Sequence, residues 1–257
     1  MSIRLYQTLA IAFTLTFAFV HCATEVPIKK ISTEEQTKID DSMGQGLAQN
    51  FEPKLTIKND IEVSVYLRKV AGKLSESAAA LQKSPVGVIT IKDRDHHWHS
   101  YALPGNRIYL SIGELKELQF DNEVAAAIAL QLGHILSRHA IKRVEVHPNV
   151  TATVADPETT QVDYFGPAGI FAFSKKDYIE ATEWAVKILY GAGYDPRGLV
   201  ALWTKFQDNP KKSPYENDAI PEILERTREA ITELSPLRNP VIMTKEFTQI
   251  KKRIARL

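Results

Sequence analysis

Residues 129–139 read A-L-Q-L-G-H-I-L-S-R-H and lie in the middle of a predicted helix. On such a helix the pattern H-E-x-x-H binds zinc through its two histidines and uses its glutamate as a general base. His134 stands at the second histidine position, whereas Leu130 and Gln131 stand where the first histidine and the glutamate would be. The segment therefore keeps one of the three groups that this zinc chemistry requires.

The substituted positions predict a loss of catalysis. Leu130 has no lone pair to offer a metal, and the amide of Gln131 is a negligible base near pH 7. His139 follows His134 by five residues, which is about 140° around a continuous helix. We therefore expect His139 to share no metal with His134 and to lie near the negative end of the helix dipole.

The elements that position these residues follow from the hydrophobic pattern. Asp121 opens the central helix, which is predicted to continue to Arg143. Two strands are predicted at 86–91 and 107–111, and between them an extended segment, 99–106, closes in a Pro-Gly turn. Further helices are predicted from Ser32, at 59–81, at 174–190, from Pro196, at 221–234 and at 244–256. The expected fold is α+β: one mostly helical domain with a small sheet.

The composition and the N-terminus narrow the functional class. The chain has 257 residues, 44% of them hydrophobic, and a net charge of +1, which gives no reason to expect a nucleic-acid partner. An apolar run, 9–20, has the length of a signal peptide, and the sole cysteine, Cys22, follows it. We predict a signal peptide at 1–22 with lipidation of Cys22, a tether at 23–31 and a domain at 32–257. A secretory signal without lipid and an uncleaved anchor are the alternatives.

Three blocks of sequence resemble the HtpX/LoiP/BepA group of zinc metalloendopeptidases, of the gluzincin type. The blocks are 101–111, 121–134 with its Gly-His pair, and 174–196, and with their order kept they cover about residues 32–210. The resemblance implies a zinc ion held by two histidines of one helix and a glutamate of a later helix. It also implies an edge strand of the sheet that lines the cleft and pairs with an extended substrate.

Carried onto this chain, the resemblance makes His134 and Glu180 residual metal ligands and places Gln131 at the general-base position. Thr182 replaces an aspartate that the family usually has, and the closest match to a C-terminal Thr-His-Pro is 238–240, which lacks the histidine. Zinc is therefore the implied cofactor, on an incomplete ligand set. Without a metal, we expect a buried His134 hydrogen-bonded to Glu180.

A rebuilt metal site is one alternative. His96, His97 and His99 surround Trp98 just before the predicted edge strand, and His99 is the candidate substitute ligand beside His134. Local packing of His99, with His96 and His97 exposed, is the other possibility.

These observations predict an exported metallopeptidase-family protein of the bacterial cell envelope, on the periplasmic side or the outer membrane, anchored by lipid. It would be catalytically inactive and bind extended segments of envelope proteins or peptides along the edge residues His99, Ser100, Tyr101 and Ala102. The alternatives are an active zinc endopeptidase with a rebuilt site using His134, Glu180 and His99, and a structural envelope lipoprotein.

Overall fold

The computed structural model describes residues 33–78, 85–146 and 163–257. The predicted signal peptide, Cys22, the tether and Ser32 lie outside these residues. No helix within the described ranges has the length and apolar character needed to cross a membrane. Residues Thr33–Leu257 form one unit, which is α+β as predicted.

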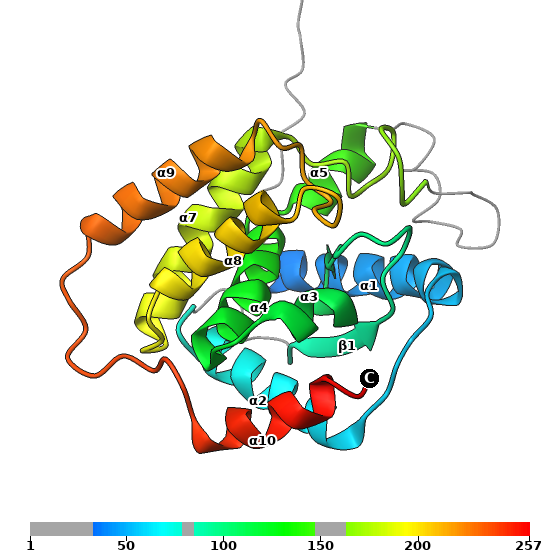
Figure 1. The fold of residues 1–257 in the computed structure, drawn as a ribbon. Helices are drawn as coiled ribbons and strands as arrows, with labels where there is room; N and C mark the ends of the chain where they lie inside the picture. Colours follow the sequence, from blue (N-terminus) through cyan, green and yellow to red (C-terminus); the bar gives the residue numbers. More distant parts are fainter. Residues whose placement is uncertain (1–32, 79–84, 147–162) are drawn as a thin grey trace, which may run out of the picture. The chain divides into compact units, whose positions relative to one another are not determined.

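The central helix α4 (Asp121–Leu136) organises this unit (Figure 1). Every residue from Asp121 to His134 is buried, because other elements pack on all sides of the helix. The helices α7 (Lys175–Gly191) and α8 (Arg197–Asp208) contact one side, and the sheet contacts the other. The motif residues of α4 therefore lie between the helical layer and the sheet.

Gly133 sets how closely α4 and α7 approach each other. A Cβ atom at this position would lie 2.2 Å from the carbonyl oxygen of Ala181 on α7. Only glycine permits this approach without a shift of one backbone. The neighbouring His134 is consequently held close to the first turns of α7.

A three-stranded sheet covers the other side of α4. Its strands are β1 (Gly87–Ile91), β2 (Tyr101–Leu103) and β3 (Arg107–Ser111), in the order β1-β3-β2. β1 runs parallel to β3 and β2 runs antiparallel to it. The strand β2 is therefore at an edge of the sheet, as the resemblance implied.

The remaining helices enclose these elements. Their bounds are α1 (Thr33–Phe51), the 3-10 helix η1 (Glu52–Lys54), α2 (Ile61–Glu76), α3 (Ile112–Glu117), α5 (His139–Val146), α9 (Ile220–Thr232) and α10 (Lys245–Ile254). Helices α2 and α10 contact each other, and α9 packs on α7 and α8. Side-chain caps at Asp60, Ser174 and Thr244 begin α2, α7 and α10.

The predicted end of the central helix is wrong, and among the predicted boundaries this one matters most for the site. The central helix ends at Leu136 and not at Arg143, and α5 begins at His139. Arg138 adopts a φ of 54°, which interrupts the helical path, and its guanidinium donates a hydrogen bond of 3.1 Å to Asp40 of α1. The chain after α4 therefore changes direction one residue before His139.

Candidate functional site

His134 lies at the C-terminal end of α4 among aromatic rings. Its side chain is 3% exposed, its ring stacks on Phe173 with centroids 4.5 Å apart, and the edge of Tyr178 lies 5.1 Å away. Burial lowers the pKa of His134 well below its ordinary value, so the imidazole is neutral at physiological pH. This histidine is therefore fixed and uncharged.

The change of direction after α4 brings His139 against His134. The two Nδ1 atoms lie 2.9 Å apart, a hydrogen-bond distance. The expectation that His139 points away from His134 is thus wrong, because it assumed one continuous helix. Burial also lowers the pKa of His139, although two nearby carboxylates oppose the shift.

The second nitrogen of His139 faces those carboxylates. Its Nε2 lies 3.4 Å from Oε2 of Glu180 and 3.6 Å from Oδ1 of Asp177, both on α7. These three side chains form the one group of metal-ligand type and spacing within the described ranges, and His134 is not in it. The direct His134–Glu180 hydrogen bond that we expected is replaced by a path through His139.

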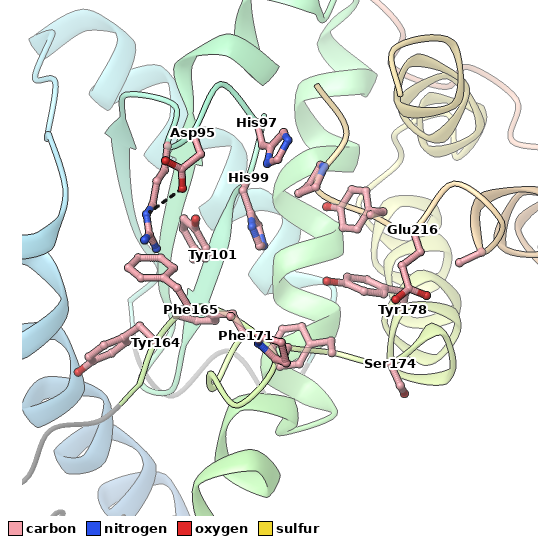
Figure 2. Close-up of a pocket in the computed structure, with 18 of the residues that line it drawn as sticks. Asp95, His97, His99, Tyr101, Tyr164, Phe165, Phe171, Ser174, Tyr178 and Glu216 are labelled. Carbon is pink, nitrogen blue, oxygen red and sulfur yellow. Dashed lines mark ion pairs between the residues drawn. The ribbon is translucent and has the colours of Figure 1, made fainter. Parts of the chain in front are cut away.

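An open cavity of about 660 Å³ lies beside the start of α7, with Ser174 and Tyr178 in its wall (Figure 2). We call it the aromatic cleft, after the rings that line it: Tyr101, Tyr164, Phe165, Phe171, Phe173, Tyr178 and Tyr215. Figure 2 shows His99 and Tyr101 on the side of β2, with Tyr178 of α7 facing them. The edge strand therefore lines the cleft, as predicted.

His99 is packed locally within this cleft. Its ring stacks on Tyr101 with centroids 4.2 Å apart, and burial, with charges at His97 and Arg94, lowers its pKa to about 3. His99 does not join the cluster of metal-ligand type formed by His139 and the α7 carboxylates. His96 and His97 are exposed, which is the arrangement that the local-packing alternative described.

The family model for peptidase family M48 matches residues 63–249, which is more than half of the chain. The chain belongs to peptidase family M48. The match includes β2, α4 and α7, and so covers every residue of the site described above. No curated protein matches this M48 chain.

The family is zinc-dependent, but the residues of this M48 chain do not fit zinc at the motif position. Leu130 is 1% exposed and supplies no donor atom, and Gln131 is buried beside it. The α7 side chain against His134 is Tyr178, and within the described ranges His134 belongs to no group of three metal ligands. The buried motif therefore supplies neither a three-ligand site nor a base for water.

The predicted edge residues of this M48 chain lie in three different environments. Ser100 faces the interior, where its hydroxyl donates to the buried Glu114 and accepts a 3.1 Å hydrogen bond from the Ser111 amide. Tyr101 lines the aromatic cleft, whereas Ala102 lines a second cavity of about 180 Å³. The pairing of this edge with a client remains a prediction.

Helix α1 contacts β2, and this contact was not predicted from the sequence. It also lines the smaller cavity, and a Cβ atom on Gly44 would lie 1.9 Å from the carbonyl oxygen of Pro104. α1 thus packs directly on the turn after β2. α1 therefore lies beside the edge of the sheet where the prediction placed an extended client.

The structure also places Thr182 and residues 238–240, the two other positions at which this M48 chain departs from the family pattern. Thr182 is fully buried in α7, and its hydroxyl makes no hydrogen bond with the described residues. Residues 238–240 line neither the aromatic cleft nor the smaller cavity, and Pro240 lines a separate one with Tyr190 and Pro196. Neither position brings a further donor atom toward His134.

Proposed function

We propose that this M48 member does not hydrolyse peptides and that it binds an extended segment of a client protein in the aromatic cleft. The observation that carries the proposal is the environment of His134. Its ring is stacked on Phe173, its Nδ1 contacts His139, and the side chain one helical turn earlier is Leu130. Activation of water by the family mechanism needs three ligands and a base, which this arrangement lacks.

The chemistry of the cleft supports peptide binding. Aromatic walls bury apolar and aromatic side chains of a ligand well. The Tyr hydroxyls and His99 can form hydrogen bonds with a peptide backbone. Arg94 lies 3.5 Å over the ring of Phe165 at the rim, and Asp95 and Glu216 add negative charge there. The open cavity favours a binding role over the purely structural alternative.

The same protein is proposed to be exported and anchored to a membrane by lipid. Residues 9–20 and Cys22 support export and lipid anchoring, on the periplasmic side or at the outer membrane. In that case Cys22→Ser releases the protein from the membrane fraction of expressing cells. Unchanged partitioning of the variant would exclude the lipid anchor.

Binding is tested with fluorescein-labelled, unfolded casein and the full chain, by fluorescence anisotropy. We expect saturable binding that Phe165→Ala weakens by about tenfold, because a partly exposed ring of the cleft is lost. Phe120→Ala is the matched control, since Phe120 is 45% exposed and lies outside the cleft. Absence of saturable binding, or equal effects of both variants, would refute the cleft as the binding site.

A further inference from the structure

We propose that His139, Asp177 and Glu180 form a zinc site of this chain, with His134 as its supporting residue and not as a ligand. The site is displaced from the motif position, which lacks the donors for a metal. The inference goes beyond the proposed client binding and does not depend on it.

The spacing of the donor atoms suits a tetrahedral metal. His139 Nε2 lies 3.4 Å from Glu180 Oε2 and 3.6 Å from Asp177 Oδ1. Zinc with bonds of about 2.0–2.1 Å separates its tetrahedral ligands by about 3.4 Å. The 3.4 Å contact with Glu180 is a long hydrogen bond in the absence of a metal, whereas the 3.6 Å contact with Asp177 exceeds the usual range of N–H···O hydrogen bonds, about 2.7–3.2 Å. The three groups are therefore placed like ligands around a shared ion.

Asp177 is held in place by the start of α7. Its Oδ2 accepts hydrogen bonds of 2.8 Å from the amide and from the hydroxyl of Ser174, in a capping box. This leaves Oδ1 directed at His139. Glu180 follows three residues later and so lies on the same face of the helix. The carboxylate pair is thus arranged by the helix before any metal binds.

The contact with His134 selects the nitrogen of His139 that can bind a metal. One hydrogen lies between the two Nδ1 atoms, which are 2.9 Å apart. A metal on Nε2 of His139 requires that hydrogen on Nδ1 of His139, from which it is donated to the neutral His134. Metal-binding histidines commonly donate their second N–H in this way to a fixed acceptor. His134 therefore orients the ligand.

Ser137 provides an independent observation at the same place. Its hydroxyl is buried and makes no hydrogen bond of standard geometry with the described residues. Glu180 is its hydrogen-bonding neighbour: burial raises the pKa of that carboxyl, and hydrogen bonds from His139 and Ser137 outweigh this and lower it. Ser137 therefore borders the carboxylate of Glu180, where a metal-bound water would have a further polar contact.

Access and charge are consistent with an open coordination position. Asp177 and Glu180 are 28% and 41% exposed, whereas His139 is 1% exposed. The ammonium of Lys142 lies 4.0 Å from Glu180 and competes with a metal for this carboxylate, but its side chain is 57% exposed and can turn toward solvent. Solvent can therefore complete the coordination on the carboxylate side.

The test titrates the full chain carrying Cys22→Ser with Co²⁺, and follows the visible absorption of tetrahedral cobalt and its loss on addition of Zn²⁺. We expect one equivalent to bind. His139→Gln or Glu180→Gln should remove the signal, and Glu183→Gln, on the same helix outside the group, should leave it unchanged. His134→Gln should weaken binding by about 10–100-fold without abolishing it.

The side chain of Glu180 is 41% exposed, so Glu180→Gln should fold and keeps the test valid if the buried His139→Gln fails to fold. Absence of Co²⁺ binding, or binding that persists in Glu180→Gln, would overturn the inference. Binding that requires His134 and is indifferent to His139 would also overturn it. Casein binding measured on Glu180→Gln should equal that of the wild type, which separates this inference from the proposed function.

Discussion

The Nδ1 atoms of His134 and His139 lie 2.9 Å apart although α4 ends between the two residues. Each imidazole is buried and is the hydrogen-bond partner of the other. His139→Leu would leave the Nδ1 of His134 buried without this partner, at a cost of about 1–3 kcal/mol in unfolding free energy. Urea denaturation at pH 7 with a chelator measures it, and His97→Leu, at an exposed position without a positive φ, should cost little. Equal stabilities of the two variants would contradict the pairing.

Gly133 gives a prediction about the packing of α4 on α7. Gly133→Ala should destabilise the fold by about 1–3 kcal/mol, because the new Cβ meets the Ala181 carbonyl oxygen at 2.2 Å. Gly46→Ala in α1 is the matched control, since nothing lies within 4 Å of its Cβ position. This control should be neutral or stabilising by about 0.5–1 kcal/mol. A stable Gly133→Ala variant would show that the helices lie further apart.

Much of this architecture could be predicted from the sequence, because it depends on local periodicity. The mostly apolar sequence of α4, the cap at Ser174 and the β-branched strand β1 each specify their element. The pairing of His134 with His139 could not be predicted, because the helix is interrupted at Arg138, an arginine and not a glycine or proline. The packing of α1 on the turn after β2 joins residues far apart in the chain, which periodicity does not report.

Glu114 predicts a pH dependence of stability. Burial raises its pKa to about 7 from 4.5, against the opposing hydrogen bond from Ser100. A raised pKa contributes stability that is complete below pH 4.5 and is lost as the pH rises through 7. The loss is up to about 3 kcal/mol, and Glu114→Gln should not show it.

Urea denaturation at pH 5 and pH 8 measures this difference. From pH 5 to pH 8 the unfolding free energy of the wild type should fall relative to that of Glu114→Gln. Glu117→Gln, at an exposed position of the same helix, should follow the wild type. A parallel pH dependence in the wild type and Glu114→Gln would mean that Glu114 is ionised in the folded protein throughout this range.

Variants that restore the H-E-x-x-H motif at 130–134 test whether the third zinc ligand is missing at position 178. In a Glu180→Gln background, Leu130→His with Gln131→Glu should not bind zinc tightly, because Tyr178 and not a carboxylate faces His134. Adding Tyr178→Glu should strengthen binding by about tenfold or more, since it completes three ligands. Isothermal titration with Zn²⁺ compares the two variants after their folding is checked by circular dichroism. Equal affinities would show that the position of Tyr178 is not decisive.

The proposed function depends most on the absence of peptide hydrolysis at His134. The direct measurement is mass spectrometry of the peptides released from unfolded casein by the full chain with one equivalent of Zn²⁺. We predict no release above that of a sample without the protein, since Leu130 and Gln131 supply neither ligand nor base. Time-dependent release that His134→Gln abolishes would contradict the account and establish an active peptidase.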